Sequence, residues 1–346
     1  MKFTCELLPL LTACRAASSA VKRSHVPIMD CLRILAVDNT LRITGSNYDT
    51  TITAALEAAV TGPGETVVNC APLLKWLDAC PKGGLVSGEN TGAMQLSCGK
   101  NVVTFSTFDA RDFYAGEAVA GVEIEGALAA MSAVSVFCAK EETRYYLRGV
   151  FLGKDCVAMD GNVLGFLPDI NGPGVIVPQE SIDVIARVAP GARFFATDTT
   201  WRAESEGITL TGKMIDGTFP DCTRIMQPEI MPLCAVSCDG LVAAVRSVAL
   251  GVAPSVFLTG GAETITARAN SAMAGVDLAT AETPCEGLAQ WATALGVSPL
   301  TRALGPFAGK SIDLGWNGSA LILQSGSAPL VMLMPYVSPE NRMPVK

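Results

Sequence analysis

The chain has 346 residues, of which 49% are hydrophobic and 17% are charged, and its formal net charge is −8. This balance excludes a disordered chain, because such a chain has too few apolar residues to build a core. The length predicts two or three domains of ordinary size. The acidic balance is unusual for a nucleic-acid-binding protein but does not exclude one, because net charge does not show where the basic residues lie.

The twelve cysteines form neither a metal-binding nor a disulfide pattern. No Cys-x-x-Cys pair occurs, and the two nearest cysteines are Cys234 and Cys238. The single histidine, His25, cannot complete a common zinc site. Most cysteines stand among apolar residues, which is typical of buried thiols in a reducing compartment. We therefore expect a cytoplasmic protein without a metal or other cofactor.

The first apolar segment, from Leu7 to Ala13 before Cys14, imitates the end of a lipoprotein signal peptide. This run is at the lower length limit for such a segment, and Glu6 directly precedes it. Only one lysine, Lys2, supplies the positive charge that a signal peptide requires before its apolar part. We expect no export, and an exported, lipid-anchored binding protein is kept as an alternative.

A short strand followed by an amphipathic helix recurs along the chain. Apolar residues three, four or seven positions apart share one face of a helix, and sets with this spacing predict six helices. In chain order these helices are centred on the segments Leu7–Cys14, Leu73–Cys80, Leu128–Cys138, Ile182–Val188, Leu241–Val248 and Leu288–Leu295. Strands are predicted before the last five, at Thr66–Val68, Val122–Ile124, Val175–Val177, Cys234–Val236 and Val276–Leu278.

The regular spacing of these units, about 56 residues on average, indicates an internal repeat. Alternating segments such as Leu41–Gly45 and Gly207–Thr211 predict antiparallel strands between the helices. Each helix is apolar on one face and must pack on a sheet, so we expect an α+β fold with two units per domain. The alternative is an ordinary α+β protein with six unrelated helices. The predicted domains are residues 1–119, 120–230 and 231–346.

The longest uncharged segment, residues 314–339, is interrupted by polar residues, glycines and two prolines. It predicts a hairpin, Leu321–Leu323 with Val331–Leu333, and no membrane span.

Several stretches resemble the β subunit of bacterial DNA polymerase III, the sliding clamp family, and they occur in the family's order. The strongest matches are to the family's RYYLNG, ATDGHRL and KLVDGRFPD motifs, at Thr143–Gly149, Ala158–Leu164 and Lys213–Asp221 respectively. Further matches are the opening residues Met1–Thr4, the segment His25–Ile28 with Arg23 before it, Val175–Pro178 and Met334–Pro335. The matches cover all three predicted domains, so the chain is identified as a divergent member of this family.

The resemblance implies a DNA clamp fold, in which antiparallel sheets form the outside of a ring and helices form its inside. Each subunit has three similar domains of two strand–helix–strands units, and a homodimer encircles double-stranded DNA. The implied function is that of a non-catalytic processivity factor that slides on DNA of any sequence. It tethers the replicative DNA polymerase and the clamp loader through a peptide-binding groove, and no membrane takes part.

By resemblance, the expected DNA contacts are Arg23 and the pair Tyr145-Tyr146, with Lys22 and Arg144 beside them. Basic side chains near phosphates attract DNA of any sequence and permit sliding. The tyrosines are alternatively ordinary packing residues of a strand. Because neighbouring residues of a strand point to opposite faces, at most one of the two rings packs inward.

The predicted helices carry about as many acidic as basic residues, which predicts weak direct DNA binding and retention by enclosure. A clamp-like peptide-binding scaffold that does not load on DNA is therefore a second alternative.

The family binds short peptides of its partners in an apolar groove between the middle and last domains. Exposed apolar walls with a few polar anchors suit such a groove, and methionines suit a surface that serves several partners. For the apolar residues the alternative is burial in the core. The residues that match the family's groove are Leu147, Met159, Gly161, Asn162, Val163, Leu164, Pro220, Arg224, Ile225, Met332, Leu333, Met334, Pro335 and Tyr336.

The chain departs from the family at two places in this groove. Asn162-Val163 stands where the family has a His-Arg pair, and the segment from Tyr336 to Lys346 continues beyond the usual family end. Both departures indicate a divergent clamp with its own partner preference.

Catalytic signatures are absent from the sequence: it has no GxSxG, P-loop, GxGxxG or HExxH motif. Asp160, Asp216 and Asp221 stand beside glycine or proline and are typical turn residues. Most cysteines stand among apolar residues, which do not lower a thiol pKa. We therefore expect no enzymatic activity.

Overall fold

A computed structural model of the chain describes residues 1–335, except 224, 227–228 and 272–275. The chain divides into two compact units. The first contains Met1–Leu128 and Glu180–Met214, and the second contains Ala129–Gln179 and Ile215–Lys346. The middle third of the chain therefore contributes to both units.

The described residues form six copies of one structural repeat, in which a strand is followed by a helix and then by three strands. This architecture confirms the predicted strand–helix–strands repeat. The helices are α1 Leu7–Ser18, α2 Cys70–Ala79, α3 Ala127–Val134, α4 Gln179–Val188, α5 Cys238–Ala249 and α6 Val297–Leu304. No helix in the described part of the chain is long and apolar enough to cross a membrane.

The first unit contains two antiparallel sheets. One has the strand order β5-β1-β7-β8-β9, and the other has the order β10-β6-β2-β3-β4-β18-β17-β16-β11. The strands of the smaller sheet are β1 Lys2–Glu6, β5 Ala59–Gly62, β7 Leu85–Asn90, β8 Met94–Cys98 and β9 Asn101–Phe105. Those of the larger sheet are β2 Cys31–Val37, β3 Thr40–Ser46, β4 Thr50–Glu57, β6 Gly64–Asn69, β10 Thr107–Phe108, β11 Val122–Glu123, β16 Arg193–Ala196, β17 Thr200–Ser205 and β18 Ile208–Lys213.

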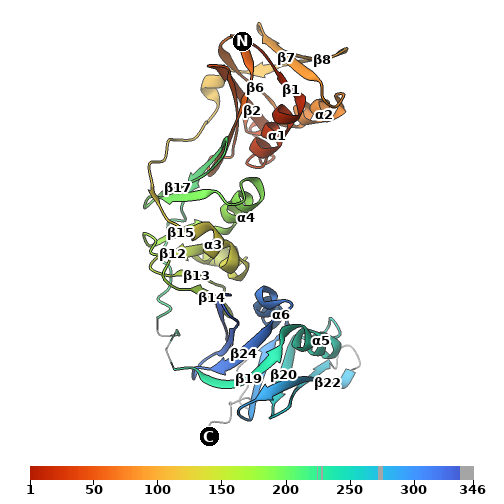
Figure 1. Cartoon of the computed structure of the whole chain (residues 1–346), viewed down its shortest axis with the longest axis vertical. Helices are drawn as coiled ribbons and strands as arrows, with labels where there is room; N and C mark the ends of the chain where they lie inside the picture. The colour runs from red at the N-terminus through yellow and green to blue at the C-terminus, as the bar shows by residue number, and fades with distance from the viewer. Residues whose placement is uncertain (224, 227–228, 272–275, 336–346) are drawn as a thin grey trace. The chain divides into compact units, whose positions relative to one another are not determined.

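The second unit contains a sheet with the order β15-β12-β13-β14-β26-β25-β24-β19-β22-β21-β20-β23. Helices α5 and α6 lie next to each other beside this sheet (Figure 1). Its strands are β12 Gly149–Leu152, β13 Cys156–Met159, β14 Val163–Leu167, β15 Val175–Pro178, β19 Met231–Ser237, β20 Ser255–Gly260, β21 Thr264–Ser271, β22 Val276–Gly287, β23 Trp291–Gly296, β24 Ser311–Trp316, β25 Leu321–Gln324 and β26 Leu330–Leu333.

Equivalent strand pairs join successive thirds of the chain. In the first unit β4 pairs with β18, and in the second β14 pairs with β26. Each pair comprises the last strand of one repeat and the last strand of a later repeat. The two large sheets therefore continue across the predicted domain limits near residues 119 and 230, and the division into three domains stays a prediction.

The predicted position of the sixth helix is wrong. Trp291 and Leu295 belong to strand β23, and the helix α6 follows it at Val297–Leu304. Trp291 and Leu295 are buried, whereas Leu288 is exposed, so their helix-like spacing does not mark one face of a helix. The true signals are Pro299 in the first helical turn and Gly305-Pro306 at the end.

The predicted hairpin of residues 321–323 and 331–333 is confirmed as β25 and β26. The helices also pack as their apolar spacing predicts. In the first unit, Leu7, Leu10, Leu73 and Leu77 of α1 and α2 enter one core cluster. All cysteines except Cys285 are buried, as the sequence indicated.

Gly165 in β14 is required for a close approach to Phe137. A Cβ atom at this position would overlap the Phe137 ring, which is fully buried. We expect Gly165→Ala to lower the free energy of unfolding by about 1–3 kcal/mol, because a packed core cannot absorb the added methyl group. Urea denaturation measures this change. The control is Gly305→Ala, where nothing lies within 4 Å of an added Cβ. A Gly165→Ala protein as stable as this control would contradict the packing described.

Candidate functional site

The turn between β13 and β14 organises the candidate site. The Asp160 side chain accepts hydrogen bonds through Oδ1 from the backbone N–H of Asn162 (2.8 Å) and of Val163 (2.9 Å). The Asp160 N–H donates to the Val163 carbonyl at 3.2 Å. Gly161 has a φ of 95°, which favours glycine because a side chain there is strained. Asp160 is therefore a turn residue, as its sequence context predicted.

The end of β26 lies against this turn. Val163 pairs with Leu333 and Leu164 with Met332 in the β14–β26 ladder. Beyond the ladder, the Met334 N–H donates to the Asn162 carbonyl at 2.8 Å. The fold thus brings together two segments that are 170 residues apart in the sequence and that were both predicted to form the groove.

The segment between β18 and β19 also packs here. The Cys222 Sγ lies 3.5 Å from the Met159 Sδ and 3.4 Å from the Pro220 carbonyl oxygen. Cys222, Leu164 and Met332 belong to one buried cluster, and Met159 and Ile225 pack against its edge. The Asn317 side-chain amide donates to the Ile225 carbonyl at 2.7 Å and holds the segment in place.

Burial divides the residues that were predicted to form the groove. Leu147, Val163, Leu164, Met332 and Leu333 are buried within the second unit. Arg224 and Tyr336 lie outside the described residues. The remaining residues, which are accessible or partly accessible, are named the Met159 patch: Met159, Gly161, Asn162, Pro220, Ile225, Met334 and Pro335.

Two arginines flank the turn. Arg302 of α6 forms an ion pair with the Asp160 carboxylate, and both side chains are largely buried. Arg144 lies next to Gly161, because a Cβ there would be 2.8 Å from the Arg144 Nη1, and it also pairs with Glu141 at 2.8 Å. Sequence reasoning missed Arg302, since nothing in the sequence links two residues 142 positions apart.

The tyrosine pair predicted to contact DNA is not in a strand. Tyr145 and Tyr146 lie in a short 3₁₀ helix, Glu142–Leu147, so the strand argument for opposite faces was wrong. Their rings meet edge to face, with centroids 5.7 Å apart. Tyr145 is 53% exposed, and the ring of Tyr145 and the Cβ of Tyr146 both lie close to Gly217. One exposed ring therefore remains available for contact, for a different reason from the one expected.

Lys22 and Arg23 lie in the first unit, in an exposed segment that follows α1. The Lys22 Nζ is 2.6 Å from the Glu180 carboxylate at the start of α4. Arg23 is exposed. Arg144 and the two tyrosines belong to the second unit.

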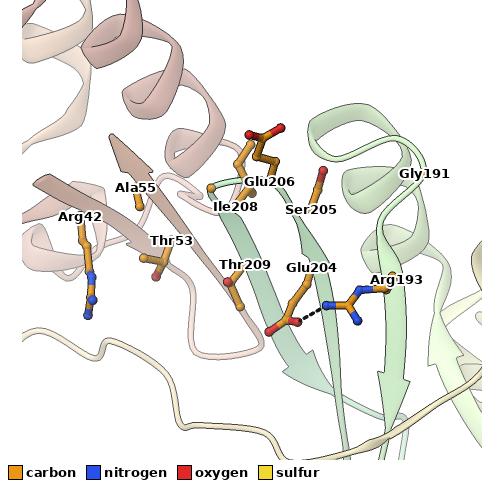
Figure 2. A pocket seen from close by; sticks show the side chains of 11 residues that line it. Arg42, Thr53, Ala55, Gly191, Arg193, Glu204, Ser205, Glu206, Ile208 and Thr209 are labelled. Atoms are coloured by element: carbon orange, nitrogen blue, oxygen red, sulfur yellow. Dashed lines mark hydrogen bonds and ion pairs between the residues drawn. The ribbon is translucent and has the colours of Figure 1, made fainter. Parts of the chain in front are cut away.

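A hollow of about 700 Å³ lies on the large sheet of the first unit at the β4–β18 pair. Figure 2 shows Arg193 and Glu204 pointing toward each other there, with Nη2 and Oε2 3.4 Å apart, and Arg42 on the other side. The Glu204 carboxylate also pairs with Arg202. This hollow is polar and its charges are partly neutralised within it, so it differs in character from the apolar Met159 patch.

The thiols are unsuited to nucleophilic chemistry, in agreement with the sequence analysis. Burial raises the pKa of Cys31 to about 11 and that of Cys234 to about 12. Burial, helped by the charge of Asp221, raises the pKa of Cys222 to about 11. Among the described residues, no group of three His, Cys, Asp or Glu side chains could hold a metal ion.

The fold is that of the DNA sliding clamps. The structure superposes on the DNA polymerase sliding clamp of Caulobacter crescentus with a TM-score of 0.89 and 23% identity, covering 98% of this chain and 100% of that one. It superposes on the DNA polymerase III β subunit of Pseudomonas aeruginosa with a TM-score of 0.88 and 22% identity, covering 97% and 100%.

The sequence carries the same relationship. It is 27% identical to the β sliding clamp of Escherichia coli K12 over 263 residues, which is 69% of this chain and 71% of that one. It is 26% identical to that of Caulobacter vibrioides over 277 residues, or 72% and 74%. No protein-family model matches the chain. In both fold and sequence the chain is therefore similar to the bacterial β sliding clamps over most of its length, at low identity.

The buried Cys222 thiol predicts how stability at the site depends on pH. Its pKa is about 11 in the folded chain against 9.0 for an ordinary thiol. The stability that protonated Cys222 contributes is full below pH 9 and is lost as pH rises toward 11, because the unfolded thiol ionises first. Urea denaturation from pH 7 to pH 10 should show the unaltered chain losing stability relative to Cys222→Ala above pH 9. A constant difference across this range would contradict the burial of the thiol.

Proposed function

We propose that the chain is a DNA polymerase processivity factor that acts as a homodimeric ring around double-stranded DNA. The observation that carries this proposal is the six-fold strand–helix–strands repeat, which matches the sliding clamps along nearly the whole chain. The role needs no catalytic group. In this proposal the ring works in the cytoplasm, where bacterial DNA lies, and the chain keeps the three-domain division of residues 1–119, 120–230 and 231–346.

Dimerisation is supported by the free edges of the sheets. Strand β9 ends the smaller sheet of the first unit, and β23 ends the sheet of the second unit. Val102 on β9 is 59% exposed. Unpaired edges with apolar side chains favour pairing with another chain, and a closed dimer satisfies them.

The contact with DNA in this proposal is weak and independent of sequence. Lys22 and Arg144 are each paired with a glutamate, which reduces their attraction for phosphates. Arg23 and Tyr145 are exposed and remain the best placed of the predicted contacts. Topological enclosure therefore keeps the ring on DNA more than local affinity does.

Loading on circular DNA tests this proposal. We expect the chain, with the clamp loader of its own organism and ATP, to stay on nicked circular plasmid through gel filtration. Cutting the plasmid once should release it, because a ring slides off free ends. Retention on the circle should survive salt concentrations that remove proteins bound to phosphates alone. Failure to load, with the loader active on its own substrates, would instead favour a peptide-binding scaffold that does not encircle DNA.

The partners proposed for the Met159 patch are short peptides of the replicative DNA polymerase and the clamp loader. The patch combines accessible apolar side chains of Met159, Ile225 and Met334 with the polar turn at Asn162. Apolar walls with backbone anchors suit extended peptides. Structural neighbours from Pseudomonas aeruginosa and Bartonella birtlesii are clamps bound to griselimycin. We propose that the same compound binds this patch.

A charge placed on the patch tests the partner site. Met334 is 38% exposed, so Met334→Glu should fold normally, yet desolvating its carboxylate against an apolar ligand is unfavourable. We expect griselimycin affinity and polymerase stimulation to fall about tenfold or more, an effect of 1.4 kcal/mol or above. Calorimetry measures the affinity for griselimycin, and a primer-extension assay measures the stimulation of the polymerase.

The matched control is Met231→Glu, which alters another exposed methionine of the same unit, 49% exposed in β19. Both variants should keep the native mass of a dimer. Equal effects of the two substitutions on binding would contradict the assignment of the patch.

A further inference from the structure

The two oxygens of the Asp160 carboxylate have separate partners. Oδ1 accepts from the backbone N–H groups of Asn162 and Val163 and shapes the turn. Oδ2 accepts from Nη2 of Arg302, which lies in the last turn of α6. The carboxylate thus joins the backbone of the middle third of the chain to a helix of the last third.

The turn itself does not require this charge. The same pair of side-chain hydrogen bonds to the backbone, with the same closing N–H···O bond, occurs at Asn47, at Asn317 and at Thr197. These three residues are neutral, and their turns are shaped in the same way. The turn at Asp160 therefore does not need the ion pair with Arg302, and the local folding of the turn does not explain why a charged residue stands there.

Water is largely excluded from the ion pair between Arg302 and Asp160. The side chains of Arg302 and Asp160 are 22% and 14% exposed. The Nε of Arg302 is buried and has no hydrogen-bond acceptor among the described residues. Asp160 is thus the main compensation for the guanidinium, and removal of either partner leaves a poorly solvated charge.

The Asp160 turn positions Met334, which is part of the Met159 patch. The Asn162 carbonyl accepts from the Met334 N–H, so the position of the turn sets that of the exposed Met334 side chain. The equivalent bond at the other junction, from the Lys213 N–H to the Asp49 carbonyl at 3.0 Å, forms beside the neutral Asn47 turn. Of these two equivalent corners, only the one in the Met159 patch is tied to a helix by a charge.

We propose that Arg302 is a positioning residue of the peptide site, which acts through Asp160 to hold the turn and Met334 in the geometry that binds a partner peptide. This inference rests on the proposed function of the Met159 patch. Arg302 does not touch the ligand in this proposal. Its effect is to keep the site preformed, so that a peptide does not have to order it on binding.

A double-mutant cycle tests the proposal, with griselimycin as the probe and calorimetry as the measurement. We expect Arg302→Met to raise the Kd about tenfold, whereas Arg302→Lys, which retains the charge, should raise it less. Asp160→Asn keeps the turn, as Asn47 and Asn317 show, but loses the ion pair. The double variant Asp160→Asn with Arg302→Met should bind no more weakly than either single variant, because both act through one contact.

The double variant also covers the case in which Arg302→Met fails to fold, since it leaves no unpaired buried charge. The matched control is Arg246→Met, which removes an exposed arginine from the last turn of α5. Amide hydrogen exchange gives a readout that a general loss of stability would not produce. In Arg302→Met the amides of Asn162, Val163 and Met334 should exchange faster, whereas that of Leu314 in β24 should not.

The outcomes separate this inference from the function on which it rests. No griselimycin binding by the unaltered chain overturns the assignment of the Met159 patch and with it the role of Arg302. Binding by the unaltered chain with an unchanged Kd in Arg302→Met overturns the positioning role alone. Additive effects of the two single substitutions, or exchange raised equally at Leu314, also overturn it.

Discussion

The antiparallel pairing of β14 with β26 is the contact on which the candidate site depends. It carries backbone hydrogen bonds between the middle and last thirds of the chain, and it places Met334 beside the Asp160 turn. Backbone groups buried in a sheet must be paired, so this register leaves little freedom to the side chains around it. The buried side chains of Leu164 and Met332 fix this register through their packing in the core. Met159 and Ile225 pack at the edge of the same cluster and are only partly buried.

The need to pair backbone groups also explains why the limits of the two compact units differ from the limits of the repeats. The first strand of each repeat joins the sheet of its neighbour: β11 pairs with β16, and β15 pairs with β12. The two repeats of the middle third therefore exchange their first strands. Half of their strands belong to the large sheet of the first unit, and the other half belong to the sheet of the second unit. A repeat alone could not cover the apolar face of its helix, because its own sheet lacks the strand that completes it.

The sequence predicted the fold better than the site. Five of six helices were placed by apolar spacing, since burial of one face imposes that spacing locally. The sixth failed because Trp291 and Leu295 are buried in a strand with helix-like spacing, a pattern that short apolar segments do not distinguish. Tyr145 and Tyr146 were predicted to lie in a strand, because aromatic residues favour strands, yet they lie in the 3₁₀ helix Glu142–Leu147.

By itself the sequence determined the repeat, the turn role of Asp160, the buried thiols and the resemblance to the sliding clamps, because each depends on local order along the chain. Only the tertiary structure decided which groove candidates are accessible, that Arg144 lies at the turn, and that Arg302 pairs with Asp160. The β14–β26 pairing and the Arg302–Asp160 ion pair both join residues more than a hundred positions apart, and nothing in the local sequence encodes such contacts. Side-chain burial is settled by the completed sheet, which is why Val163 and Leu333 are buried while Met334, one residue further, is exposed.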